Sequence, residues 1–593
     1  MAYVINQVNC SGCHQCKLEC PAGAIHYKNS KYFIEPDKCV ECGRCAEICH
    51  NAAISNPDRP KAAPMPHEKI IRECDVVVLG CGGAGSVAAA KLADLDKKVV
   101  VLEKNWEVGG SAAFGHMGRF LWCKWAEADG VADPREKLYR RCVKNLEPLG
   151  VNMKLVKNLL DANVDMANWL IDTGKLEEGF RWEDGPRGKG LTYTYEYYLN
   201  ELRTDPSCGP GDSGWYITNH LTDACKAKGG ELFVNAEATE LLIENGKCVG
   251  VLAKDPGGEI EVHAKAVIVA TGAFTRNREL TAKFQPLFYQ DEGCEPVHVY
   301  TCATCTGDGI AMCEKVGAEI DYVNKRCAMF GPMHHPFSYC MVALSRSSSS
   351  VTVDKDGHEL PMAIGMTEIG VLVNTPGRYA WSIIDHQDLM ANVEENKNSP
   401  VIDSRMAVAN WEKDLADEIA DGTTVKADTL EDLADKLGFD RSAFMAYIEK
   451  HNLDIRDGKV GGMFGPPPSD VDDKEGPGGP GGSGDPDDDD MPMMMPMGEM
   501  PKPHALEQGP FYAVFMKMFH ENAIGGMTID ENLNVVTTDH KPIPGLYACG
   551  DTCRGIMVPG SVGVNFIEGV LSAMTSAMTG GYAAAVNAAA YAN

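Results

Sequence analysis

Hydrophobic positions recur along the chain in short unbroken runs, separated by glycine turns and by stretches of small residues. The run Asp75–Leu79 is apolar after its first residue, and glycines follow it at once. An alanine-rich stretch, Ser86–Leu95, comes next, and a second apolar run, Val99–Leu102, ends at Glu103. Unbroken apolar runs of this length are typical of strands buried on both faces of a parallel sheet. The pattern predicts a strand–turn–helix–strand unit of the α/β class.

Two stretches of different composition interrupt this pattern. Residues 56–68 include four prolines, which is typical of a stiff linker. Residues 457–505 shift to Gly, Pro and Asp, and the ten residues 491–500 contain six methionines. Such a segment cannot bury enough apolar surface to order itself, so we expect a solvated insertion. The methionines are interpreted as part of an exposed loop or as a soft patch for a partner or a thiophilic metal.

Composition and charge narrow the range of functions. The 593 residues include 55 Lys and Arg against 84 Asp and Glu, a formal net charge of −29. An acidic surface of this kind repels phosphate backbones and anionic lipids, which excludes nucleic-acid binding. No run of about 18 apolar residues occurs, and Met1–Asn6 lacks the basic-then-apolar pattern of an export signal. We therefore expect a soluble, cytoplasmic protein without a membrane span.

The chain has 23 cysteines, which in a large chain without an export signal indicate cofactor ligands and reduced thiols, and the first eight follow one spacing twice. The pattern Cys-x2-Cys-x2-Cys-x3-Cys occurs at Cys10, Cys13, Cys16 and Cys20, and again at Cys39, Cys42, Cys45 and Cys49. Three thiolates at this spacing surround three corners of an Fe4S4 cube, and the fourth reaches across to the other cube. The first cluster is thus predicted on Cys10, Cys13, Cys16 and Cys49, and the second on Cys39, Cys42, Cys45 and Cys20. A pair of zinc sites is the alternative, but zinc gives no reason for the x3 offset.

The doubled spacing and the Cys20-Pro21 step resemble the bacterial two-cluster ferredoxins over residues 1–60. His50 stands where that family has a second proline. This departure touches the chain turn and not a ligand, so the resemblance still implies two [4Fe-4S] clusters. Residues 61–72 are expected to link this module to the rest of the chain.

A glycine motif follows the first predicted strand of the α/β unit. It spans Gly80–Gly85 in the order Gly-Cys-Gly-Gly-Ala-Gly. Gly80 allows a tight turn, Gly82 lets a pyrophosphate approach the helix N-terminus, and Gly85 lets helix and strand pack closely. Glu103, at the end of the second strand, can accept hydrogen bonds from ribose hydroxyls. This order of elements predicts a dinucleotide site, with a plain glycine-rich turn as the alternative.

Three further motifs indicate which dinucleotide is bound. They are Gly109-Gly110-Ser111, the strand-ending turn Thr271-Gly272, and Gly550-Asp551 near the C-terminus. Together they point to FAD, and they resemble the flavoprotein family of soluble fumarate reductases and 3-ketosteroid dehydrogenases over residues 73–593. The resemblance implies that the double glycine covers the diphosphate and ribityl chain, and that Asp551 lies near the ribityl hydroxyls. The His-Thr-x-Ala-Ala segment of covalent flavoproteins is replaced here, so we expect non-covalent FAD.

The resemblance also implies a domain order and a set of cofactor contacts. In this family a capping domain interrupts the FAD-binding domain, which places FAD binding in residues 73–285 and 511–593 and the cap in 286–510. The fold class expected is therefore an α/β and α+β multidomain protein, with a ferredoxin domain, a Rossmann-like FAD-binding domain and an inserted α+β capping domain. The candidate FAD contacts are Gly80, Gly82, Gly83, Ala84, Gly85, Glu103, Lys104, Gly109, Gly110, Ser111, Gly118, Ala238, Thr271, Gly272, Gly550, Asp551, Ser561 and Val562.

The substrate region departs from the soluble fumarate reductases. Ser561 stands where that family has a carboxylate-clamping arginine, and Asn522 replaces a histidine. A charged carboxylate without a cationic partner is costly to desolvate, so these changes argue against a small dicarboxylate substrate. Tyr512 resembles the tyrosine that helps hold the substrate carbonyl in the ketosteroid-dehydrogenase branch. His386 falls where the family has its proton-donating arginine, and a histidine can donate at neutral pH.

Each of these catalytic candidates has a plainer interpretation. Tyr512 suits a core aromatic and His386 a surface histidine, while His335 is a third candidate that would have to face the cleft. Cys302-x2-Cys305 and Cys549-x3-Cys553 are interpreted as structural thiols, because isolated pairs of this kind are common among so many cysteines.

Iron–sulfur clusters pass single electrons, whereas a flavin stores one or two electrons and delivers a hydride. Their combination therefore indicates a protein that couples one-electron transfer to two-electron chemistry. We predict an FAD-dependent oxidoreductase acting on CH–CH groups, in which an external donor protein supplies electrons through the clusters to reduce an enone-type or enoate-type C=C bond. The reverse dehydrogenation and an electron-transfer subunit of a larger complex are the alternatives. A homo-oligomer and a hetero-oligomer both fit the sequence.

Overall fold

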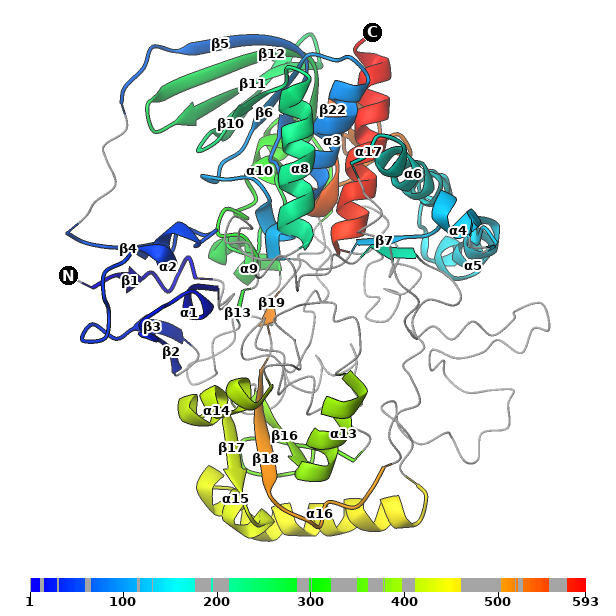
Figure 1. The fold of residues 1–593 in the computed structure, drawn as a ribbon. Coiled ribbons are helices and arrows are strands. Elements are labelled where there is room, and N and C mark those ends of the chain that lie inside the picture. Colours follow the sequence, from blue (N-terminus) through cyan, green and yellow to red (C-terminus); the bar gives the residue numbers. More distant parts are fainter. Residues whose placement is uncertain are drawn as a thin grey trace.

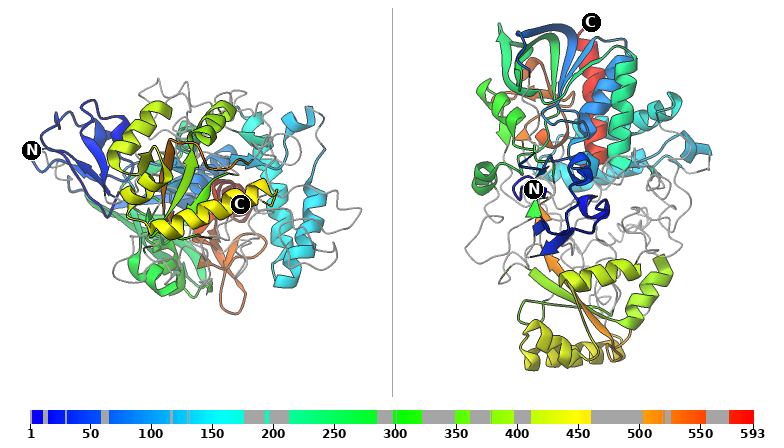
Figure 2. Two further views of the ribbon diagram at one scale, coloured as in Figure 1. Left: turned by 90° about the horizontal axis from the view of Figure 1, so that it is seen from below. Right: turned by 60° about the vertical axis from the view of Figure 1, so that its left-hand side comes forward.

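The computed structural model places the ferredoxin module, the FAD-binding sheet and the cap in three separate regions (Figures 1 and 2). The cap lies at the opposite end of the molecule from the FAD-binding sheet, and the ferredoxin module lies at one side between them. The structure describes residues 2–10, 15–28, 31–58, 65–114, 118–128, 130, 132–175, 193–195, 213–284, 298–299, 301–321, 349–360, 377, 379–396, 411–459, 503–517, 519–520, 526–553 and 573–593. Cys13, His335, Asn522, Ser561 and Val562 lie outside these ranges.

The FAD-binding sheet has a parallel centre in the order β9-β6-β5-β12-β22. Its core strands are unbroken apolar runs, and the residues of β6 and the last four residues of β5 are at most 2% exposed. Two antiparallel strands extend one side of β12, and a short strand pairs with β22. The strands are β5 (Ile70–Leu79), β6 (Val99–Leu102), β9 (Glu231–Phe233), β10 (Glu237–Glu244), β11 (Lys247–Asp255), β12 (Gly258–Val269), β21 (Asn534–Val536) and β22 (Pro542–Ala548).

Helices built from small residues cover this sheet. The first, α3 (Gly83–Asp94), packs against α17 (Ala573–Tyr591), where a Cβ at Gly581 would lie 2.1 Å from the Ala84 carbonyl oxygen. Only a helix without a side chain at that position can approach so closely. The helix predicted over 86–95 is present as α3, with shifted ends. The surrounding elements are η1 (Gly110–Phe114), β7 (Gly118–Phe120), α4 (Lys124–Ala128), α5 (Arg135–Leu146), η2 (Glu147–Leu149), α6 (Met153–Asp172), β8 (Tyr193–Tyr195), α8 (Ser213–Ala227), α9 (Arg278–Phe284), β14 (Ile320–Asp321), β20 (Gly526–Met527) and η9 (Gly550–Thr552).

The cap is an antiparallel sheet in the order β15-β16-β18-β17 with helices around it. Thr429 and Asp440 cap two of these helices by accepting hydrogen bonds from backbone N–H groups of the first turn. The strands are β15 (Val351–Val353), β16 (Tyr379–Asp385), β17 (Thr424–Ala427) and β18 (Phe511–Lys517). The helices are α13 (His386–Asn396), α14 (Trp411–Asp421), α15 (Leu430–Leu437) and α16 (Arg441–Arg456).

Both predicted limits of the cap differ from the structure. β18, which was expected to open the second FAD-binding segment at 511, pairs with β16 and β17 inside the cap sheet. Conversely, α10 (Asp308–Lys315), which was expected inside the cap, buries Ile310, Met312 and Cys313 in the core of the FAD-binding domain. Composition does not distinguish the two domains at these points, because strands and amphipathic helices of either domain carry similar residues. β5 likewise begins at Ile70, within the predicted linker.

The ferredoxin module repeats one small unit. Its elements are β1 (Val4–Ile5), α1 (Gln15–Leu18), β2 (Ile25–Lys28), β3 (Lys31–Ile34), α2 (Arg44–Glu47) and β4 (Ile54–Ser55). β1 pairs antiparallel with β4, and β2 with β3. The 457–505 insertion was predicted to be solvated, and its residues from 460 to 502 lie outside the described ranges. Among the described helices, none combines the length and the apolar character that a membrane crossing requires.

Candidate iron-sulfur and flavin site

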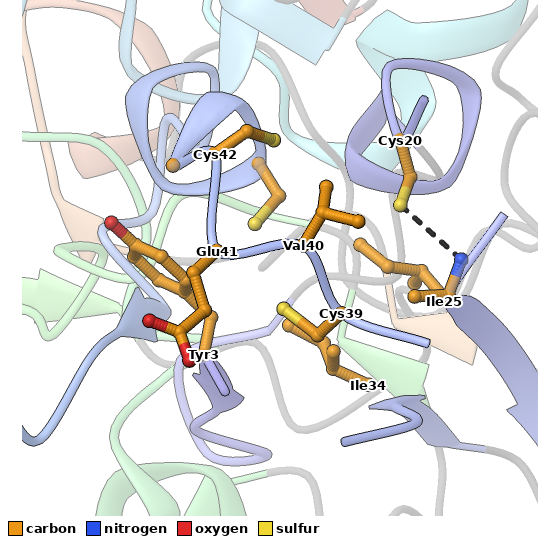
Figure 3. Close-up of a pocket in the computed structure, with 11 residues that line it drawn as sticks. Tyr3, Cys20, Ile25, Ile34, Cys39, Val40, Glu41 and Cys42 are labelled. Atoms are coloured by element: carbon orange, nitrogen blue, oxygen red, sulfur yellow. Dashed lines mark hydrogen bonds between the residues drawn. The ribbon is translucent and has the colours of Figure 1, made fainter. Parts of the chain in front are cut away.

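Four cysteines from both halves of the ferredoxin module line one hollow (Figure 3). They are Cys20, Cys39, Cys42 and Cys45, the set predicted for the second cluster. Ile25 and Ile34 contribute apolar walls. Cys20 comes from the first half of the repeat and reaches the other three, so the fold brings together the crossed ligand set that the spacing predicts.

The chemistry of this hollow fits an iron–sulfur cluster. Burial and the nearby thiol groups of Cys20, Cys39 and Cys42 raise the pKa of Cys45 to about 11. Metal ligation requires the thiolate, so a bound cation would displace the Cys45 proton. The Ala24 N–H also donates a hydrogen bond of 3.3 Å to Cys20 Sγ, and bonds to sulfur of this kind tune cluster potentials.

The ligands predicted for the first cluster gather around the same small core. Cys10, Cys16 and Cys49 are partly buried against it, and Cys13 lies outside the described residues. The Ala53 N–H donates a hydrogen bond of 3.2 Å to Cys49 Sγ, four residues back along the chain. Ala24 and Cys20 have the same relation in the first half, so the repeat in sequence is also a repeat in hydrogen bonding.

His50, the residue next to Cys49, joins the ferredoxin module to the predicted flavin loop. Its ring is 1% exposed, with Nδ1 at 2.6 Å from Glu107 Oε1 and Nε2 at 3.0 Å from the Gly110 carbonyl oxygen. Asn105 Nδ2 and Trp106 Nε1 donate hydrogen bonds of 3.1 and 3.0 Å to the His50 carbonyl oxygen. The histidine therefore does more than alter a turn: it anchors the end of the second repeat in the FAD-binding domain.

Electrostatics support this anchor. Burial lowers the pKa of His50, but hydrogen bonds to Cys302 and Glu107 outweigh burial and raise the pKa to about 10. The ring is thus held as a cation between two acceptors. Sequence reasoning missed this role, and the only signal was the histidine itself in place of a proline.

The glycine motif leaves no room for side chains where the backbone is expected to meet FAD. A Cβ at Gly80 would lie 2.4 Å from the Ala270 carbonyl oxygen, and one at Gly85 would lie 1.9 Å from the Gly80 carbonyl oxygen. Gly82 and Gly109 form a parallel bridge, so the two glycine loops lie side by side. Gly83 and Ala84 open α3, whose N-terminus faces this cradle. The arrangement fits a diphosphate held by backbone N–H groups.

Glu103 and Lys104 fix the loops around this cradle. The buried Glu103 carboxylate accepts hydrogen bonds from the Cys81 and Asn105 N–H groups at 2.6 and 2.7 Å, although burial still raises its pKa. Lys104 Nζ lies 2.9 Å from Thr306 Oγ1 and 2.7 Å from Asp308 Oδ2. Lys104 therefore links the start of α10 to the segment that follows β6. Ala238 lies in β10 at a bulge, and Gly118 begins β7.

The C-terminal motif supplies a carboxyl group that fits flavin hydroxyls. Burial raises the pKa of Asp551 to about 6, and no described residue donates a hydrogen bond to its carboxylate. A half-buried acid without protein donors fits donors from a ligand, which ribityl hydroxyls would supply. Gly550 has φ +74° at the start of the same turn, and Thr271 Oγ1 lies 3.1 Å from Thr552 Oγ1. Gly272 follows in the left-handed region.

Two of the three catalytic candidates, Tyr512 and His386, lie in the cap. Tyr512 is 1% exposed in a hydrophobic cluster, and its hydroxyl lies 3.3 Å from His386 Nδ1, on the exposed first residue of α13. The structure thus brings these two residues together. β18 runs from Tyr512 towards β19 (Phe519–His520), which pairs with β13 (His298–Val299) beside the FAD-binding domain. Tyr512 lies about 16 Å back along the strand from its end at Lys517, so the catalytic assignment stays a prediction.

Comparisons with known proteins agree with this geometry. Residues 75–561 match the family model described as FAD binding domain, and residues 9–54 match that of the 4Fe-4S dicluster domain. The chain is 24% identical over 504 residues to an NADH:fumarate oxidoreductase of Klebsiella pneumoniae, covering 84% of this chain and 46% of that protein. It is 30% identical over 268 residues to a urocanate reductase of Eggerthella lenta, covering 44% of this chain and 41% of that protein. The chain thus spans less than half the length of either relative.

A solved structure extends the comparison to the fold. The 3-ketosteroid Δ1-dehydrogenase of Sterolibacterium denitrificans superposes with a TM-score of 0.61 at 18% identity, over 88% of this chain and 100% of that one. The predicted resemblance to the fumarate reductases and ketosteroid dehydrogenases is confirmed. Because its FAD-binding model spans well over half of the sequence, the chain belongs to the FAD binding domain family of flavoproteins, with a 4Fe-4S dicluster domain at its front.

Proposed function

We propose that the protein is an FAD-dependent oxidoreductase that reduces an activated C=C bond with electrons delivered through two [4Fe-4S] clusters. The observation that carries this proposal is the junction at His50. It connects the residue after a predicted cluster ligand to the carbonyl of the glycine loop at the flavin site, at 3.0 Å. A module that only stored iron would not need this contact, whereas an electron route from cluster to flavin requires the two cofactors to lie close together.

The relatives support the class of substrate. Those named above as fumarate and urocanate reductases reduce a C=C bond conjugated to an acceptor group. Ser561 and Asn522 remove the two cationic clamps expected for a small dicarboxylate, so an enone, an enoate or an enoyl thioester fits better. The electron source would be an external redox protein.

The chain's own groups would hold the cofactors. When bound, the clusters pass single electrons, and the flavin collects two of them and delivers a hydride. Gly82 and Gly109, which bridge their two loops, would let the backbone approach the diphosphate, and the Asp551 carboxylate would accept hydrogen bonds from the ribityl hydroxyls. Tyr512 would donate to the substrate carbonyl, and His386 would protonate the α-carbon.

Reoxidation of the anaerobically reduced holoenzyme tests the function. The dithionite-reduced protein is mixed with a panel of enones, enoates and enoyl thioesters, and flavin absorbance is followed. At least one class should reoxidise the flavin and yield the saturated product. Reoxidation by none of the panel, with electrons still passing to an artificial acceptor protein, would favour a relay subunit instead. Acid precipitation should release the FAD, because we propose non-covalent binding; flavin retained in the pellet would contradict this.

Two variants test the catalytic pair. Tyr512→Phe keeps the ring in its hydrophobic cluster and removes only the hydroxyl, so flavin reoxidation by substrate should slow by about 10²–10³-fold. His386→Ala should slow turnover by about 10²–10⁴-fold and leave flavin reduction by the clusters intact. Wild-type rates in both variants would assign the pair to packing of the cap sheet.

A further inference from the structure

Cys302 and Cys305 lie in one tight turn between β13 and α10, close to both predicted cofactor regions. The Cys305 N–H donates a hydrogen bond of 3.0 Å to the Cys302 carbonyl oxygen. A turn closed by this bond keeps its first and fourth Cα atoms within about 7 Å, which overlaps the range that a disulfide spans. Both thiols are unpaired in the structure and buried, at 0% and 5% exposure. The sequence interpretation of the pair as structural rested on spacing alone.

The two sulfurs face different cofactor regions. Cys302 Sγ lies 3.8 Å from Nε2 of His50, which holds the ferredoxin module. Cys305 Sγ lies 3.3 Å from Oγ of Ser111, in the double-glycine motif. A Cβ at Gly272, in the turn after β12, would also lie 3.3 Å from Cys305 Sγ. The pair therefore sits between the ferredoxin anchor and the loops that are expected to hold FAD.

The surroundings shift the pKa values of the two thiols in opposite directions. Burial opposes ionisation of Cys302, but hydrogen bonds from His50 and Thr304 outweigh burial and lower its pKa. Burial raises the pKa of Cys305 to about 12. A Cys-x-x-Cys pair in which one thiol is more acidic than the other is the usual arrangement of redox-active dithiols. Ser111 also accepts a hydrogen bond of 3.1 Å from the Cys302 N–H, which fixes both cysteines to the flavin loop.

We propose that Cys302 and Cys305 form a redox-active dithiol that exchanges two electrons with the bound flavin. In the oxidising direction, the Cys302 thiolate and the Cys305 thiol form an S–S bond. The two electrons and the Cys305 proton pass to FAD, which becomes FADH⁻; the reverse step restores thiolate, thiol and FAD. Both sulfurs are buried, and Cys305 contacts the double-glycine loop that is expected to hold FAD, so the flavin is the redox partner that the proposal names. The proposal rests on flavin binding, not on the C=C reduction proposed above.

Differential alkylation of the anaerobic holoenzyme tests the proposal directly. One sample is reduced with dithionite and another is oxidised with ferricyanide, and both are then denatured in acid, alkylated and analysed by peptide mass spectrometry. We expect a Cys302–Cys305 disulfide in the oxidised sample and two alkylated thiols in the reduced one. Cys313, a deeply buried thiol in α10, is the internal control and should be alkylated in both. Free thiols at 302 and 305 in both samples would overturn the proposal.

An electron count provides a second, independent test. Dithionite titration of the oxidised wild-type holoenzyme should consume about two more electrons per chain than titration of Cys302→Ser, since a disulfide is a two-electron couple. Cys313→Ser should match the wild type. Equal counts in Cys302→Ser and the wild type, at equal iron and flavin content, would refute the dithiol. Neither test uses a C=C substrate, so failure here leaves the proposed function standing.

Discussion

The two halves of the cysteine repeat are built alike and end differently. In each, the last cysteine accepts a hydrogen bond from the N–H four residues on, Ala24 to Cys20 and Ala53 to Cys49. The following residue is an exposed proline in the first half, Pro21, and a histidine that is 1% exposed in the second. The repeat thus determines the geometry of the cluster ligands. The residue that follows each half, Pro21 or His50, determines which half contacts the FAD-binding domain.

The difference between the two halves indicates the direction of electron transfer through the ferredoxin module. Cys49 is predicted to ligate the first cluster, and its neighbour His50 is bound to the flavin loop. The hollow of the second cluster lies beside Val40, which is 64% exposed, and Cys42, which is also exposed. We therefore expect the second cluster to receive electrons from outside and the first to pass them to FAD.

The largest expected effect separates the two clusters. Cys20→Ala and Cys49→Ala should each reduce the iron content from about eight to about four atoms per chain, because each removes one ligand of one cube. Cys20→Ala should spare the first cluster, whereas Cys49→Ala should abolish flavin reduction by a one-electron donor. Iron analysis and electron paramagnetic resonance measure both outcomes. Loss of the cluster bound by Cys10 in Cys20→Ala would show that the ligands do not cross over.

An intermediate effect is expected from the residues that follow the repeats. His50→Pro restores the proline of the ferredoxin pattern and removes the ring contacts with Glu107 and Gly110. Loss of positioning at this junction should slow electron transfer from cluster to flavin by about 10²-fold, at unchanged iron and FAD content. Stopped-flow bleaching of the flavin measures it.

Pro21→Ala is the matched control for this variant, because Pro21 holds the same place in the other half and is exposed. It should leave the rate unchanged. His50→Gln keeps a polar side chain at the junction and should recover part of the rate. If the His50→Pro variant transfers electrons to the flavin as fast as the wild type, the residues after the two halves are equivalent. The proposed direction of electron transfer, from the second cluster through the first to FAD, would then be wrong.

The sequence predicts those parts of the molecule that depend on local spacing. The cysteine repeat, the strand Val99–Leu102 and the glycine turn at Gly80–Gly85 are all where the pattern puts them. The His50 junction and the place of the Cys302 turn depend on contacts between segments distant in the chain, which periodicity does not encode. The cap limits were misplaced for the same reason, since only strand pairing shows that β18 belongs to the cap.

The smallest expected effect concerns the charge beside His50. Glu107→Gln replaces an ionic hydrogen bond of 2.6 Å with a neutral one, which should cost about 1 kcal/mol of unfolding free energy. Glu19→Gln is the matched control in the other half of the repeat, where Glu19 pairs with Arg44 at 2.9 Å on an exposed surface. That change should cost less than about 0.5 kcal/mol, because exposed ion pairs contribute little. Urea unfolding of the anaerobic holoprotein compares the two, and an equal loss in both variants would mean that the Glu107–His50 pair is no more important than a surface contact.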